Sequence, residues 1–91
     1  MNAGKHHLSA RHVRTLRAIF TEPAPANLRW DEIERMLRAL GASLQEGRGS
    51  RLRVALSGAR AVFHRPHPEK EASRSTVRSI RSFLEEAGVR P

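Results

Sequence analysis

The chain has 91 residues, and its 17 Lys and Arg against 9 Asp and Glu give a formal net charge of +8. A chain of this length folds as one small domain with a thin core, and the lack of cysteine excludes disulfides and thiolate metal sites. No apolar run is long enough to span a membrane, and the basic N-terminus lacks the apolar stretch of a secretory signal, so we expect a cytoplasmic protein.

Arginine supplies nearly all of the positive charge, because Lys5 and Lys70 are the only lysines. A large net charge can serve solubility alone. The planar guanidinium group, however, suits bidentate contact with phosphate or carboxylate groups. The composition therefore favours an acidic partner, either a nucleic acid or an acidic protein.

Residues 1–27 are interpreted as a helical extension followed by a Pro-rich connector. Residues 1–8 have no periodicity and are expected to form a frayed end. After Ser9, a suitable N-cap, ARHVRTLRAIF has helical spacing, and the prolines of TEPAPAN stop the helix. The arginines of this helix could contact RNA or a partner. The need to bury its apolar face favours a role in the core, and that face comprises Val13, Leu16, Ile19 and Phe20.

Two further helices carry clear amphipathic patterns. The second has three acids in its first turn and ends at Gly41, and the last leads to Gly88. Their apolar faces comprise Trp30, Ile33, Met36, Leu37 and Leu40 in the second helix and Val77, Ile80, Phe83, Leu84 and Ala87 in the last.

Residues 42–64 change from helical to strand periodicity. A short strand is expected at 42–46, and Leu52, Val54 and Leu56 then alternate with polar or small residues before the turn residues Ser57-Gly58. A third strand follows up to His64. The predicted fold class is α+β, with helices on one face of a three-stranded antiparallel sheet.

A two-residue turn at Ser57-Gly58 fixes the pairing of the last two strands. It places residue 56 opposite 59, 55 opposite 60, 53 opposite 62 and 51 opposite 64. The face away from the helices then carries Arg51, Arg53, Arg60 and His64. His64 lies opposite Arg51, with about 5 Å between the Cβ atoms.

Such a surface suits RNA. Arginines hold phosphates, and an imidazole can take a proton from a ribose 2′-hydroxyl or give one to the leaving 5′-oxygen, which requires no metal or other cofactor. The alternative is that His64 merely ends a strand and that the arginines solvate an open face.

Two other motifs give only weak indications of a binding site. His64 and His67 could bind a metal, but a third ligand at a diagnostic distance is missing, so no metal site is predicted. The GRGS stretch at residues 47–50 leads into a strand, which favours a tight turn over a phosphate-binding loop.

The segment from Trp30 to Val89 resembles the HicA family of toxin–antitoxin mRNA interferases. The resemblance rests on Gly49-Ser50-Arg51 entering the second strand, Pro66-His67-Pro68 after the third, and the LEEAG that closes the last helix. It implies a double-stranded-RNA-binding-domain-like fold over residues 28–91. It also implies metal-independent cleavage of mRNA and inactivation by a HicB-type antitoxin.

One position departs from the family motif. The family normally reads Gly-Ser-His, with a catalytic histidine, whereas this chain has Arg51. Because the hairpin places His64 opposite, His64 becomes the candidate catalytic residue. The candidate RNA-binding residues are Gly49, Ser50, Arg51, Arg53, Arg60 and His67.

Three functions are left open by the sequence. The first is a ribonuclease toxin that uses His64. The second is a module that binds RNA or antitoxin without cleavage, which Arg51 favours. The third, a DNA-binding helical module, is disfavoured by the acids that begin the second helix.

Overall fold

The computed structural model describes residues 8–91, so most of the frayed end predicted for residues 1–8 lies outside the described residues. Helices and strands follow one another in the predicted order of helix, helix, three strands, helix. They are α1 (Ala10–Ile19), α2 (Trp30–Ala39), β1 (Ser43–Glu46), β2 (Arg51–Leu56), β3 (Ala59–His64) and α3 (Arg74–Glu86).

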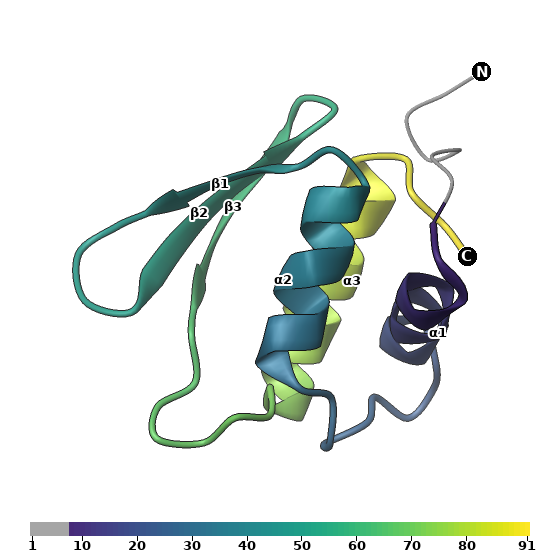
Figure 1. The fold of residues 1–91 in the computed structure, drawn as a ribbon, viewed down its shortest axis with the longest axis horizontal. Helices are drawn as coiled ribbons and strands as arrows, with labels where there is room; N and C mark the ends of the chain where they lie inside the picture. Colours follow the sequence, from purple (N-terminus) through teal and green to yellow (C-terminus); the bar gives the residue numbers. More distant parts are fainter. Residues whose placement is uncertain (1–7) are drawn as a thin grey trace.

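The elements form three layers (Figure 1). The antiparallel sheet, in the order β1-β2-β3, lies on one side of the molecule, α2 and α3 lie next to it, and α1 lies on the far side. The α+β prediction with helices on one face of the sheet is therefore confirmed, and the arrangement is consistent with a double-stranded-RNA-binding-domain-like fold. Within residues 8–91, no helix is both long enough and apolar enough to cross a membrane.

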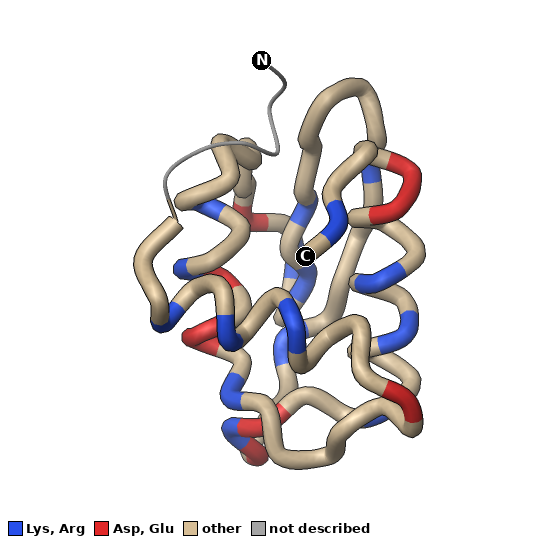
Figure 2. Tube along the Cα trace, turned by 90° about the vertical axis from the view of Figure 1, so that its right-hand side faces the viewer, with Lys and Arg blue, Asp and Glu red and all other residues tan. Residues whose placement is uncertain are grey.

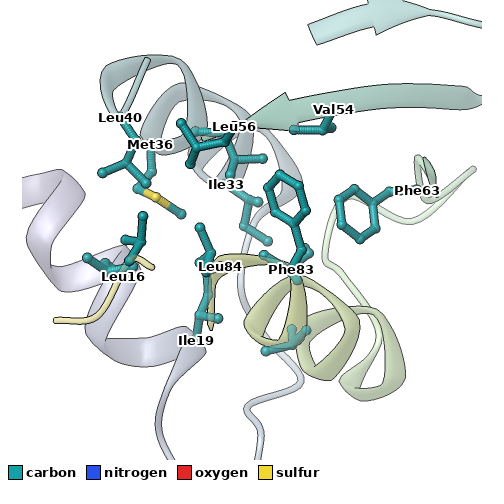
Figure 3. Packing of buried hydrophobic residues seen from close by; sticks show 14 of the residues in the cluster. Leu16, Ile19, Ile33, Met36, Leu40, Val54, Leu56, Phe63, Phe83 and Leu84 are labelled. Atoms are coloured by element: carbon teal, nitrogen blue, oxygen red, sulfur yellow. The ribbon is translucent and has the colours of Figure 1, made fainter. Parts of the chain in front are cut away.

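One hydrophobic core joins all three layers (Figure 3). Ile19 of α1, Ile33 of α2 and Leu84 of α3 are fully buried, and each such side chain contributes about 1.5–3 kcal/mol by leaving water. Phe63 of β3 packs edge-on against Trp30 and Phe83, with ring centroids 6.5 and 5.9 Å apart. This packing fixes β3 immediately before His64.

Side-chain hydrogen bonds dock α1 and its connector onto the other helices. Arg81 of α3 donates to the carbonyl oxygens of Ile19 (2.8 Å) and Thr21 (2.9 Å) at the end of α1. Arg74 donates to the carbonyl of Ala24 at 3.0 Å. Of the predicted apolar face of α1, Leu16 and Ile19 are buried in the shared core and Phe20 packs against it, whereas Val13 is half-buried outside the core cluster. The boundary between an extension of residues 1–27 and a domain of residues 28–91 stays a prediction.

The β2–β3 hairpin has the predicted register. Leu56 pairs with Ala59 across the two-residue turn, and Arg51 pairs with His64 at the other end. Ser57 and Gly58 both have positive φ angles, 50° and 85°. Positive φ at both central residues defines the type I′ turn, whose twist matches the twist of the strands it joins.

Candidate nucleic-acid interface

The open face of the sheet is cationic and carries no carboxylate. Strand alternation and the observed registers place Arg51, Arg53, Arg60 and His64 on this face, and all four are exposed, as predicted. The other side chains on it are Ser43, Gln45, Ala55 and Val62. Within residues 8–91, none of these arginines forms an ion pair.

A hollow of about 490 Å³ lies at the His64 end of this face. Its lining brings His64 together with Arg51 and Arg53, two of the predicted RNA-binding residues. The complete lining is Gly47, Arg48, Arg51, Arg53, Val62 and His64. An exposed imidazole thus shares one open hollow with three guanidinium groups, a suitable environment for a phosphodiester.

The backbone geometry brings the side chains of Arg51 and His64 close together. The Arg65 N–H donates to the Ser50 carbonyl at 2.8 Å, so residues 50 and 65 form a hydrogen-bonded pair of the ladder. The next pair, Arg51 and His64, is therefore of the non-hydrogen-bonded type. In such pairs the Cα atoms are about 4.5 Å apart and the side chains are closest. The two side chains thus project from neighbouring points of the surface.

The remaining predicted RNA-binding residues lie outside this hollow. Arg60 lines an adjoining hollow of about 350 Å³ farther along the sheet, which Arg53 also borders. His67 lies on the other side of His64, in a hollow of about 500 Å³ between the β3–α3 loop and the start of α3. Gly49 and Ser50 form the β1–β2 turn and line none of these hollows.

The β1–β2 turn has the tight geometry that the sequence predicts. The Arg51 N–H donates to the Arg48 carbonyl at 3.2 Å, and Gly49 has a φ of 63°, a left-handed conformation that glycine adopts without strain. The turn also places Arg48 in the hollow, which the sequence reasoning missed. Only the β1–β2 register could have identified Arg48, and no turn motif as clear as Ser57-Gly58 sets that register.

An ion-pair cluster around the buried Glu34 anchors the chain directly after His64. The Arg65 guanidinium donates to Glu34 at 2.6 Å and to Glu46 at 2.6 and 2.7 Å, while the Trp30 indole also donates to Glu34. Hydrogen bonds from Arg65 hold the pKa of Glu46 below its ordinary value, and the two carboxylates raise the pKa of Arg65. This Arg65 cluster ties the end of β3 to α2 and β1, which limits the movement of His64.

The histidines of the described part of the chain, residues 8–91, form no larger cluster. Within residues 8–91, no three His, Cys, Asp or Glu side chains lie close enough together to hold a metal ion. His64 and His67 share one hollow with Arg65 and with two carboxylates, Glu69 and Glu71. In the other hollow His64 is accompanied by three arginines, an environment better suited to an anion than to a metal ion.

Comparison with known proteins identifies the family. No curated protein and no solved structure matched the chain. The family model described as "HicA toxin of bacterial toxin-antitoxin" matches residues 30–89, which run from α2 to just beyond α3 and exclude α1. This span contains the hollow, both turns and the Arg65 cluster. The match confirms the resemblance drawn from the sequence, and the chain belongs to the HicA family of toxins.

Proposed function

We propose that this HicA-family chain is an endoribonuclease that cuts mRNA without a metal ion, and that His64 is its catalytic acid and base. The proposal includes a HicB-type antitoxin as its inhibitor and the cytoplasm as its location. The observation that supports it most is the position of His64 opposite Arg51, in a hollow lined by three arginines. The family match supports the broader assignment as a toxin.

The imidazole of His64 can carry the proton transfers of RNA cleavage. It takes the proton of the ribose 2′-hydroxyl, whose oxygen attacks the adjacent phosphorus. The bond from phosphorus to the 5′-oxygen breaks, and the imidazolium returns its proton to that oxygen. The products are a 2′,3′-cyclic phosphate and a 5′-hydroxyl, so no water is consumed in this step.

The arginines stabilise the charge that develops on the phosphate. Arg48, Arg51 and Arg53 surround the hollow and carry no competing ion pair within residues 8–91. Donors fixed in place before the reaction lower the barrier most, because they need no reorganisation as charge builds up. Arg51 itself cannot act as the base, since a guanidinium stays protonated in proteins.

A second function follows from Arg51. Because the family motif has its histidine at this position, a chain with arginine there would be a module that binds RNA or antitoxin without cutting RNA. In that case His64 contributes no chemistry, and the cationic face serves binding alone.

Cleavage of a structureless RNA in EDTA separates the two functions. We expect the wild-type chain to cut and His64→Ala to lose at least about a hundredfold in rate, the usual contribution of an acid–base group. Arg51→His is the matched variant, because it restores the motif histidine. Circular dichroism of each variant verifies the fold.

The outcomes are distinct. If the wild-type chain cuts RNA and His64→Ala cuts it equally fast, another residue is the catalytic acid and base, and the role of His64 is overturned. An inert wild type together with an active Arg51→His variant would identify a HicA scaffold whose cleavage has been lost, which is the second function.

A further inference from the structure

The outer edge of β3 has unpaired backbone groups. The Arg65 N–H points toward β2, where it bonds the Ser50 carbonyl, so alternation along the strand points the N–H and C=O groups of Arg60, Val62 and His64 away from β2. No hydrogen bond joins these groups to another part of residues 8–91. Such a row of donors and acceptors is a template for an added strand.

Open space runs along this edge. A hollow of about 160 Å³ lies between the end of β3 and the flank of α3, and its α3 lining consists of hydroxyl side chains. The lining residues are Val62, Phe63, His64, Ser75, Thr76 and Ser79. Small hydroxyl side chains leave room for another backbone and can hydrogen-bond its side chains.

The opposite edge of the sheet is less suited to pairing. β1 has four residues where β3 has six, and it leads directly into the β1–β2 turn. Its last residue, Glu46, is held by Arg65. Short edge strands and charged side chains are common ways in which proteins discourage pairing with another chain.

The side chains along β3 indicate what the added strand would be. Val62 is 53% exposed, the one large hydrophobic side chain among residues 8–91 that is exposed to this degree, and Arg60 and His64 lie on either side of it. A second copy of β3 paired antiparallel about Val62 would bring Arg60 opposite His64 of that copy, which is unfavourable whenever the imidazole is charged. Charge complementarity therefore favours an acidic strand with an apolar residue at its centre.

We propose that an extended, acidic segment of the cognate antitoxin pairs with β3 as a fourth strand. The side chains of that strand that point to the open face would lie beside His64 and close one side of the hollow. Backbone pairing provides affinity, and alternate side chains provide specificity. The proposal rests on the antitoxin partner that family membership implies and does not depend on RNA cleavage by this chain.

Amide exchange in the full-length chain tests the pairing directly. The probe is the protein encoded immediately beside this gene, purified in complex with the ¹⁵N-labelled chain. In the complex, exchange of the Val62 and His64 amides should slow by at least about tenfold, because both become hydrogen-bonded. The outward-facing amides of Leu44 and Glu46 on β1 are the internal control and should keep their rates.

Two substitutions at one position separate backbone pairing from side-chain docking. Val62→Pro removes an outward N–H, and proline is tolerated on an edge strand where its nitrogen faces away from the neighbour. Val62→Ser removes the apolar side chain and keeps the N–H. We expect Val62→Pro to weaken the complex by about tenfold or more and Val62→Ser by less than about threefold, measured by isothermal titration calorimetry. Thermal unfolding of both variants verifies the fold.

Several results would overturn the proposal. One is the absence of a complex with the wild-type chain, and another is a complex in which the Val62 and His64 amides exchange as fast as before. Equal losses for Val62→Pro and Val62→Ser would assign binding to the side chain. Loss of RNA affinity in Val62→Pro with antitoxin affinity unchanged would make this edge an RNA site. If the wild-type chain does not cut RNA but gives the expected amide exchange and the expected affinities of the Val62 variants, strand pairing is supported and only the catalytic proposal fails.

Discussion

Most arginines on the helical side of the molecule bind acids or carbonyl oxygens, whereas those on the open face of the sheet do not, in the part of the chain that the structure describes. On the helical side, basic and acidic segments lie next to one another (Figure 2). Arg11 pairs with Glu32, Arg81 pairs with Glu22, and Arg35 pairs with both Asp31 and Glu32. On the open face, no arginine has a carboxylate partner within residues 8–91.

This difference divides the arginines of the chain by the partners that they have. Arginines next to acids or to free carbonyl oxygens hold elements together, as Arg81 does at the end of α1. Among the described residues 8–91, the unpaired arginines of the sheet lie together on one face, where their positive charge can attract a polyanion, whereas the unpaired Arg14, Arg17 and Arg78 lie on the helices. The net charge of +8 alone does not reveal this division.

The Arg65 cluster should give the largest effect on stability. We expect Arg65→Met to lower the free energy of unfolding by about 2 kcal/mol, because Glu34 is buried and loses its strongest partner. Arg35→Met is the matched control, since Arg35 is 52% exposed against 27% for Arg65 and neither of its partners is buried, and it should cost at most about 0.5 kcal/mol. Urea unfolding measures both, and equal losses would contradict the distinction between a cluster that contains a buried carboxylate and pairs at the surface.

Substitutions on the open face of the sheet should affect RNA binding and leave stability nearly unchanged. Arg51→Gln combined with Arg53→Gln should change the free energy of unfolding by less than about 0.5 kcal/mol. The same double variant should make the slope of log affinity against log salt for single-stranded RNA shallower by about 1.4, or about 0.7 for each phosphate that an arginine no longer neutralises. Fluorescence anisotropy at several salt concentrations measures this slope.

Arg14→Gln combined with Arg17→Gln removes the same number of charges from exposed positions of α1. We expect it to leave the RNA salt slope unchanged. A slope that decreases equally in both double variants would mean that RNA also contacts α1, and the separation of the two faces would be lost.

The Arg65 cluster also predicts a pH dependence. The folded-state pKa of Glu46 lies below its unfolded value because of the hydrogen bonds from Arg65, so its stabilising effect is complete above the unfolded pKa of about 4.3. The effect is lost as the pH falls through the lower, folded-state pKa. The stability difference between wild type and Glu46→Gln should therefore shrink on acidification, as urea unfolding between pH 7 and pH 3 can measure. A difference that is independent of pH would exclude this linkage.

A substitution in the β2–β3 turn should give the smallest change in stability. Ser57 has a positive φ of 50°, which favours Asn over most side chains in a type I′ turn. Ser57→Asn should raise the free energy of unfolding by about 0.5 kcal/mol, because Asn tolerates this conformation better than Ser. RNA binding should not change. A decrease in stability would mean that the Ser57 side chain has a role beyond the turn.

Local sequence patterns predict most of the fold. Helical spacing predicted the three helices, and the Ser57-Gly58 turn alone predicted the register that places His64 opposite Arg51. These features depend on neighbouring residues, so a sequence reveals them directly.

Contacts between distant residues were not predictable in the same way. Glu34 and Arg65 are 31 residues apart, and Ile19 and Arg81 are 62 residues apart, with no local pattern linking either pair. The position of Arg48 in the hollow also depends on β1 pairing, for which the sequence has no strong turn signal. The sequence predicted which residues lie on the open face of the sheet. Which arginines instead bind acids or carbonyl oxygens elsewhere in the molecule became clear only from the structure.

The most direct measurement of the central claim exchanges the two residues of the facing pair. The variant Arg51→His combined with His64→Arg keeps composition and charge and moves the imidazole across the non-hydrogen-bonded pair. If the two positions present their side chains to one hollow, the exchanged chain should cut structureless RNA in EDTA within about tenfold of the wild-type rate. Loss of cleavage to the level of His64→Ala in a folded exchange variant would contradict the account, as would an inert wild type beside an active exchange variant.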